Sequence, residues 1–268
     1  MDKTIFITGA SSGLGRATAK LFASKGWNVI ATMRNPDKEL ELKGLERITL
    51  LPLDVTNVEN IEATVKSALS ISDVDVLFNN AGYGLAGPLE AYSDMQISRQ
   101  FETNTLGMIR TAKAFIPHFR TKQRGIIINT TSIGGLVAYP LGSIYHATKW
   151  AVEGWSEGMW FEMALHNISI KTVSPGGIKT DFMGRSLDAA QHEAYAALFN
   201  KVLAAFNSED VLKANTPESI AAVVYEAATD GKKQLRYLAG DDAVETYNQR
   251  LKVGPEAFKD GVAQAFEL

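Results

Sequence analysis

The chain has 268 residues, of which 46% are apolar and 21% charged, a balance typical of a globular protein with a sizeable core. Its net charge of −3, without any run of about five basic residues, argues against a nucleic-acid partner. The absence of cysteine excludes disulfides, thiolate catalysis and cysteine-ligated metals, and the four histidines lack metal-ligand spacing, so we expect no metal site.

Short β-branched runs alternate with helix-length amphipathic segments along the chain. Strands are predicted at 4–8, 28–32, 48–53, 74–78, 126–130 and 169–174, with a weaker seventh near 235–238. Helices are predicted between them, at about 14–24, 58–69, 95–120, 143–166 and 217–229. Most strands are apolar on both faces, as strands covered by helices on both sides are. The pattern predicts a single doubly wound α/β domain over residues 1–268, with a central parallel sheet of about seven strands and helices on both faces.

The segment from about 176 to 206 interrupts this alternation with a mixture of small, apolar and charged residues. Two interpretations have equal weight: a substrate lid that follows the sixth strand, or a surface helix pair without a role. We predict no specific role for residues after about 183.

A glycine-rich turn joins the first predicted strand to the first helix, and it contains Gly9, Ser11, Ser12, Gly13, Leu14 and Gly15. Glycine allows a tight turn and close approach of a phosphate, and the helix N-terminus offers free N–H groups to a pyrophosphate. A P-loop does not fit, because Leu14 and Gly15 stand where it needs Gly and Lys. The turn also matches the G-x-S-x-G nucleophile elbow with Ser11 as nucleophile, but we expect no earlier strand to supply the oxyanion hole. A dinucleotide site is therefore predicted, with a turn that binds no ligand as the alternative.

Tyr145 and Lys149 are four residues apart in a predicted helix and so share one face. A phenol has a pKa of ~10, and a neighbouring ammonium together with a cationic nicotinamide ring would lower it toward ~7, which corresponds to roughly 4 kcal/mol. Tyr145 would then act as general acid in carbonyl reduction and as general base in alcohol oxidation. Ser132, just past the fifth strand, could hold the substrate carbonyl by a hydrogen bond. The alternatives without a catalytic role are that Tyr145 and Lys149 form an exposed pair on a solvated helix face, and that Ser132 is an ordinary turn residue.

Jointly, these motifs resemble the short-chain dehydrogenase/reductase family, in its short single-domain branch. The resemblance covers residues 3 to about 182 and rests on Thr8-Gly-x-x-x-Gly-x-Gly15, Asp54-Val55, Asn79-Asn80-Ala81-Gly82, Asn104, Ser132, Tyr145-x-x-x-Lys149 and the segment from Pro175 to Thr180. It implies the catalytic residues Asn104, Ser132, Tyr145 and Lys149, with Asn104 supporting a water-linked proton relay. It implies cofactor contacts from the glycine-rich turn and from Asp54, Val55, Asn80, Ala81, Gly82, Tyr145, Lys149, Pro175, Gly176, Ile178 and Thr180.

The end of the second strand bears on the choice of cofactor. Met33 stands where family members that prefer NAD usually carry Asp, and Arg34 follows it. Without the carboxylate a 2′-phosphate is not repelled, and a guanidinium can bind that phosphate with two hydrogen bonds. Arg16 is a second candidate, whereas Ser12 stands where NADPH-preferring members commonly carry a basic residue. We expect NADP(H) to be favoured over NAD(H), and the reduced state of that pool suggests a reductase.

The expected substrate contacts are Ser132, Tyr139, Tyr145 and Phe182, in a pocket that suits an apolar ketone, aldehyde or secondary alcohol. Resemblance to the family implies a homodimer or homotetramer through the Tyr–Lys helix and the helix before it. Trp150, Trp155, Met159 and Trp160 would contribute to this interface, and the alternative is their burial within one subunit. A non-catalytic dinucleotide-binding sensor is the alternative, against which the complete catalytic set argues.

The remaining expectations concern the setting of the protein. No apolar run approaches the ~18 residues that span a membrane, so no membrane partner is expected. The first residues, MDKTIFITGA, lack a signal peptide's long apolar stretch, and we expect a cytoplasmic protein.

Overall fold

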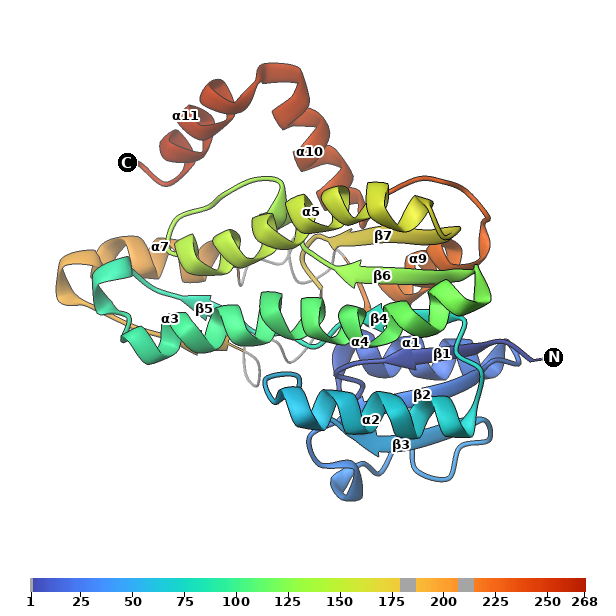
Figure 1. Cartoon of the computed structure of the whole chain (residues 1–268). Helices are drawn as coiled ribbons and strands as arrows, with labels where there is room; N and C mark the ends of the chain where they lie inside the picture. Colours follow the sequence, from blue (N-terminus) through green and yellow to red (C-terminus); the bar gives the residue numbers. More distant parts are fainter. Residues whose placement is uncertain (1, 179–186, 207–214) are drawn as a thin grey trace.

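A seven-stranded parallel sheet in the order β3-β2-β1-β4-β6-β7-β9 forms the centre of the computed structural model, which describes residues 2–178, 187–206 and 215–268 (Figure 1). All predicted strands are present, with bounds that differ from the expected ones by at most two residues. They are β1 (Thr4–Ile7), β2 (Asn28–Met33), β3 (Ile48–Pro52), β4 (Val76–Asn79), β6 (Gly125–Thr130), β7 (Ile168–Pro175) and β9 (Arg236–Ala239). The predicted doubly wound α/β fold is confirmed.

Helices cover both faces of the sheet because successive strand side chains point to opposite sides. Ile5 and Ile7 belong to a core with residues of α1 (Gly13–Ser24) and α9 (Pro217–Thr229). Phe6 belongs to a second core on the opposite face, with residues of α2 (Val58–Ile71), α4 (Gly107–Lys122) and α5 (Ser143–Ala164). Figure 1 shows α2, α4 and α5 on one face of the sheet, and α1 and α9 on the other.

The strand order reverses direction at β1, which pairs with β2 on one side and β4 on the other. In open parallel sheets a ligand crevice forms at such a switch point, outside the carboxyl ends of the strands. The glycine-rich turn after β1 and the loops after β4, β6 and β7 therefore meet at one edge of the sheet.

The helix predicted at 95–120 is not continuous. It consists of α3 (Asp94–Phe101), a π-helical segment (Glu102–Leu106) and α4, and the Gly107 N–H bonds to the Glu102 carbonyl five residues earlier. Asn104 lies in this π-helical turn. Such turns occur often at functional sites because the wider backbone turn redirects side chains and carbonyls.

Several short elements are not expected from the sequence. β5 (Gly84–Ala86) and β8 (Leu187–Ala189) form a separate parallel pair, although about a hundred residues separate them. Two further helices, α10 (Asp241–Val253) and α11 (Pro255–Ala265), end the chain. The remaining elements are α7 (Ala196–Phe206) and the 3₁₀ turns η1 (Pro36–Lys38), η2 (Leu89–Ala91), η4 (Ile133–Gly135) and η5 (Glu193–Tyr195). Within the described ranges, no helix has the length and apolar character needed to cross a membrane.

Candidate active site

A cleft of about 1200 Å³ lies at the carboxyl ends of the strands. It brings together most of the predicted site residues, and Gly15 and Asn104 lie behind its wall. Thr180 and Phe182 lie outside the described residues. The predicted residues that line the cleft are Gly9, Ser11, Ser12, Gly13, Leu14, Arg34, Asp54, Val55, Asn80, Ala81, Gly82, Ser132, Tyr139, Tyr145, Lys149, Pro175, Gly176 and Ile178.

The glycine-rich turn needs glycine at two positions. Gly9 has φ +68°, and a Cβ there would lie 2.8 Å from the Cα of Ala81. A Cβ on Gly15 would overlap the Gly9 carbonyl oxygen. Larger residues would therefore push the turn away from the loop after β4.

Hydrogen bonds fix this turn against the loop after β4. The Thr8 hydroxyl accepts the backbone N–H of Asn80 at 2.9 Å and that of Ala81 at 3.0 Å. The Asn80 amide in turn donates to the carbonyls of Thr8 and Gly9, both at 3.1 Å. Ser12 caps α1 without a side-chain hydrogen bond, so the N–H groups of the first helical turn stay available to an anion. This cradle fits the pyrophosphate of a dinucleotide.

At the far end of the cleft, Asp54 accepts hydrogen bonds from the Thr56 backbone at 2.9 Å and from its hydroxyl at 2.7 Å. Burial alone would raise the pKa of Asp54, but these bonds and the guanidinium groups of Arg34 and Arg99 lower it below its usual value. The carboxylate is thus ionised and fixed where adenine binding is expected, with Arg34 beside it.

Arg16, the second candidate for binding a 2′-phosphate, is engaged elsewhere. Its guanidinium pairs with Glu41 and with the buried Glu39 at 3.3 Å, and it donates to the Ser11 carbonyl. It does not line the cleft. Its two carboxylate partners come from the loop after η1, a contact that short-range sequence patterns do not reveal.

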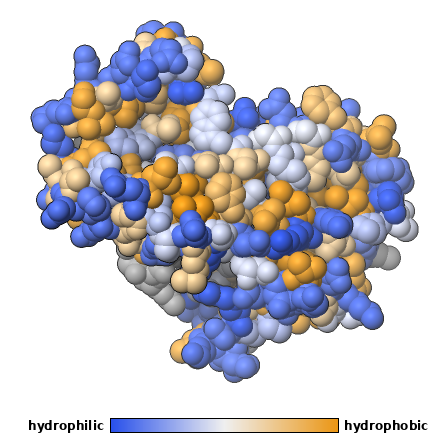
Figure 2. All heavy atoms as spheres, turned by 60° about the vertical axis from the view of Figure 1, so that its left-hand side comes forward, coloured by the Kyte–Doolittle hydropathy of each residue, from blue (hydrophilic) through white to orange (hydrophobic). Residues whose placement is uncertain are grey.

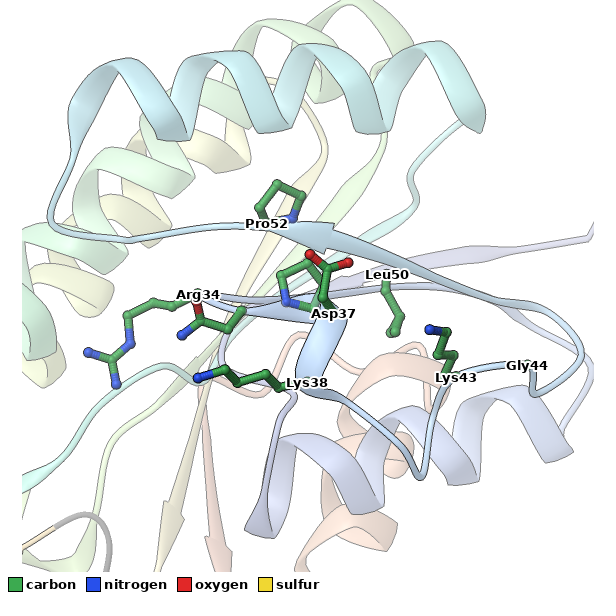
Figure 3. Close-up of a pocket in the computed structure, with 9 residues that line it drawn as sticks. Arg34, Asp37, Lys38, Lys43, Gly44, Leu50 and Pro52 are labelled. Carbon is green, nitrogen blue, oxygen red and sulfur yellow. The ribbon is translucent and has the colours of Figure 1, made fainter.

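A second hollow of about 720 Å³ adjoins the Arg34 end of the cleft, and Arg34 lines both. Lys38 and Lys43 line this hollow together with Asp37 (Figure 3). In Figure 3 the side chains of Arg34 and Lys38 extend toward the same side of the view. The end of β2 is therefore a positively charged corner of the site.

Tyr145 and Lys149 lie on one face of α5, and the Lys149 ammonium is 5.8 Å from the centre of the Tyr145 ring. Lys149 is buried and donates to the Thr130 carbonyl at 3.0 Å. Burial lowers the pKa of Lys149 to about 8, although the carboxylate of Glu153 acts in the opposite direction. The side chain is therefore a cation poised to lose its proton near neutrality.

The phenol of Tyr145 differs from the expectation in one respect. Burial raises its pKa above the usual value, and a hydrogen bond with Ser132 only partly opposes this. The protein's own charges thus do not make the phenol acidic. The lowered pKa of Tyr145 expected from the sequence depends in part on the positive charge of an oxidised nicotinamide ring. That charge would come from the cofactor and not from the protein.

Ser132 lies two residues after the end of β6 and caps η4. Its hydroxyl oxygen accepts the Gly134 N–H at 3.0 Å, which leaves its proton available to Tyr145 or to a ligand in the cleft. The same hydroxyl faces Tyr145, as the effect on the pKa of that residue shows. Ser132, Tyr145 and Lys149 thus converge on one point of the cleft.

Asn104 is fully buried and points toward the backbone of its neighbours. It pairs with Tyr83, and its amide nitrogen lies 3.4 Å from the Thr148 hydroxyl. The structure therefore gives Asn104 a bracing position next to the catalytic helix. Its role in a proton relay stays a prediction.

Three residues that sequence reasoning did not select join the site. His146 uses both ring nitrogens, one toward the Gly134 carbonyl at 2.8 Å and one toward the Tyr139 N–H at 3.1 Å. Thr131 lines the cleft and donates to the buried carboxylate of Glu153 at 2.7 Å. The sequence signal for Glu153 was its position four residues after Lys149, which places both charged residues on one face of the helix.

The opposite wall of the cleft is largely apolar. It is formed by β5, by α7 and by the loop that precedes α5. Figure 2 shows hydrophobic residues gathered among hydrophilic ones on this side of the molecule. Tyr139 lines this wall, and its hydroxyl pairs with Thr246 of α10. The apolar lining residues include Leu85, Ile133, Leu141, Leu187, Phe199, Val202 and Leu203.

Comparison with known proteins agrees with this geometry. A family profile described as short chain dehydrogenase matches residues 3–191. A 3-ketodihydrosphingosine reductase of Bacteroides thetaiotaomicron is 37% identical over 210 residues, which are 77% of this chain and 76% of that protein.

Solved structures show the same fold. A short-chain dehydrogenase from Streptomyces avermitilis superposes with a TM-score of 0.84 and 31% identity, over 94% of each chain. ElxO with NADP bound gives a TM-score of 0.76 and 27% identity, over 91% of this chain and 100% of that one. The chain therefore belongs to the short-chain dehydrogenase/reductase family, whose oxidoreductases act on alcohol and carbonyl groups with a nicotinamide cofactor.

Proposed function

We propose that this oxidoreductase uses NADPH to reduce the carbonyl group of an apolar ketone or aldehyde. The observation that carries the proposal is the convergence of Ser132, Tyr145 and Lys149 on one point of a cleft whose opposite wall is apolar. The complete catalytic set also favours an enzyme over a non-catalytic dinucleotide sensor, which has no need of an acid.

Each residue has a distinct role in this proposal. The chemistry that a bound reduced nicotinamide would supply is a hydride for the carbonyl carbon. The free hydroxyl proton of Ser132 donates to the carbonyl oxygen, and Tyr145 gives its phenolic proton to that oxygen as negative charge develops there. The Lys149 ammonium stabilises the phenolate that remains. Water then returns a proton to Tyr145.

Arg34 supports the preference for NADP(H). Met33 and Arg34 line the cleft at the end of β2, so the ribose would meet a guanidinium instead of a carboxylate there. Because Arg16 is held by two glutamates, Arg34 is the favoured partner of the 2′-phosphate, with Lys38 nearby. The similarity to ElxO, which was solved with NADP bound, supports the same preference.

The apolar wall supports the substrate class. Phe199, Val202 and Leu203 of α7 face a long cleft, in which an aliphatic chain would lose water-exposed area. A relative named for reduction of 3-ketodihydrosphingosine is in keeping with such a substrate. The assignment of residues 1–268 to one domain, and of about 176–206 to a lid, stay predictions.

The homodimer or homotetramer also stays a prediction, but the structure changes which residues could form its interface. Met159 is buried in the core of its own subunit, and Trp155 and Trp160 pack against that core. Trp150, Phe161 and Leu165 remain exposed on α5, where a homodimer or homotetramer would bury them. The cytoplasmic location also remains a prediction.

The test is the consumption of NADPH with methyl ketones and aldehydes of increasing chain length. We expect turnover to rise with chain length and to be slower with NADH. Tight NADPH binding without turnover across the whole series would instead favour the sensor.

A further inference from the structure

Glu153 is a buried carboxylate in the middle of the catalytic helix. It lies one turn after Lys149 on the same face of α5 and is only 4% exposed. Charged residues are rarely so buried unless they are paired. Its position next to the active site therefore calls for a physical explanation.

Hydrogen-bond donors from the loop after β6 and from strands β7 and β9 hold this carboxylate. One oxygen accepts the hydroxyls of Thr131 at 2.7 Å and Ser174 at 2.9 Å. The other accepts Nε of Arg236 at 3.0 Å and its Nη2 at 2.9 Å, and the Thr172 hydroxyl lies at 3.4 Å. These donors hold the carboxylate in one orientation.

The surroundings of Lys149 are otherwise almost neutral. From β6 it meets only the Thr130 carbonyl, and from its own helix the ring of Tyr145. His146, the next residue on α5, has a lowered pKa because it is buried. Glu153 is the charged group that opposes the effect of burial on Lys149. Arg236 faces Glu153 from β9, and Tyr247 of α10 lies against that guanidinium.

We propose that Glu153 is a positioning residue of the reaction: its fixed carboxylate, buried one helical turn from Lys149 on the same face of α5, keeps that side chain charged at the cofactor cleft. The hydrogen bonds that β7 and β9 donate to the Glu153 carboxylate link these two strands to α5. The inference rests on the proposed role of Lys149 in binding the cofactor and assisting Tyr145. It predicts that Glu153 acts through the charge of Lys149, beyond its contribution to folding.

The test is the pH dependence of NADPH affinity, followed by the fluorescence of the bound cofactor. Wild-type affinity is expected to fall as pH rises through about 8, where Lys149 loses its proton. In Glu153→Gln the midpoint of this fall should move to lower pH by on the order of one unit, because the opposing carboxylate charge is gone. If a substrate is in hand, the alkaline limb of kcat/KM should move in the same direction.

Two controls separate charge from structure. Ser174→Ala removes a hydrogen bond to Glu153 but keeps its charge, so it should lower the melting temperature and leave the pH midpoint in place. Glu157→Gln makes the same substitution at an exposed position one turn further along α5, and it should change neither.

Glu153→Gln could fail to fold because it leaves the partly buried Arg236 without its partner. The double variant Glu153→Gln/Arg236→Met removes the ion pair as a unit, a change that buried pairs often tolerate. It should show the same shift to lower pH, because Arg236 is not among the groups that shift the pKa of Lys149. A wild-type midpoint in both Glu153 variants, or a wild-type affinity that does not depend on pH, would overturn the inference. In either case, the proposed function would still stand if the protein binds NADPH.

Discussion

Asn104 pairs with both backbone polar groups of Tyr83: its Oδ1 accepts the Tyr83 N–H at 3.0 Å, and its Nδ2 donates to the Tyr83 carbonyl at 2.8 Å. This side chain thus helps to close the loop between β4 and β5, in which the cofactor contacts Asn80, Ala81 and Gly82 are predicted. The π-helical turn sets Asn104 in this position. The wall of the cleft consequently depends on a residue that does not line it.

Asn104→Ala should reduce the free energy of unfolding by about 1–3 kcal/mol, because it leaves the Tyr83 N–H without a partner and leaves the Tyr83 carbonyl with only the Gln100 amide, at 2.9 Å. Urea unfolding measures this loss. Asn248→Ala, at an exposed position of α10, is the matched control and should change stability by less than about 0.5 kcal/mol. Equal stability of the two variants would show that the bracing contact contributes little.

Arg34→Ala should weaken NADPH binding more than NADH binding. A hydrogen bond to a charged group contributes about 1.5–3 kcal/mol, which corresponds to roughly a tenfold to hundredfold loss of affinity for NADPH alone. Titration of the intrinsic fluorescence with each cofactor gives both constants, with NADH as the internal control. An equal loss for the two cofactors would remove the basis for the NADP(H) preference.

Phe199→Ala should discriminate between substrates by length. Removal of a large apolar side chain from the cleft wall costs about 1.5–3 kcal/mol of transfer free energy, so kcat/KM for a long-chain ketone should fall roughly tenfold or more. A short methyl ketone that does not reach α7 should be affected little. If both substrates lose activity in proportion, α7 is not part of the substrate wall.

A buried ion pair away from the cleft should govern acid stability. Lys171 of β7 is 2.7 Å from Asp230, which also accepts the Tyr237 hydroxyl at 2.7 Å. Burial would raise the pKa of Asp230, but its partners lower it to about 2. Asp230→Asn should therefore cost about 3–5 kcal/mol at neutral pH, because Lys171 is left buried and unpaired.

The pH dependence of this effect has a definite sign. A carboxyl with a lowered pKa stabilises the fold above its unfolded value of 3.8, and this contribution is lost as pH falls through about 2. The difference between wild type and Asp230→Asn should shrink over that interval in urea unfolding. Asp73→Asn, which replaces an exposed carboxylate 2.7 Å from Lys122, should cost less than about 1 kcal/mol throughout. A constant difference for Asp230→Asn down to pH 2 would contradict the assignment.

Local patterns in the sequence predict most of this fold and much of the site. The parallel strands are continuous apolar runs, and a ligand edge follows from their order, so the sequence alone predicts that Gly9, Ser132 and Tyr145 lie together. The break at Asn104 could not be predicted, because the apolar spacing from α3 to α4 is close to that of one helix.

The remaining differences come from contacts between distant parts of the chain. The β5–β8 pair consists of two strands of three residues each, too short for a strand pattern. The pairing of Arg16 with Glu39, and of Glu153 with Arg236, joins residues that only the folded chain brings together. Sequence spacing shows which side chains share a helix face, but not which partner neutralises them.

The most direct test of the central claim is the turnover and NADPH affinity of Tyr145→Phe, measured together on one ketone substrate. The substitution removes only the phenolic oxygen, so NADPH affinity should stay within a few fold of wild type, while kcat falls by about 10²–10⁴. Tyr225→Phe, on α9 with its ring packed against Phe22, is the matched control and should keep wild-type turnover. Wild-type turnover in Tyr145→Phe would contradict the assignment of this residue as the acid of the reaction.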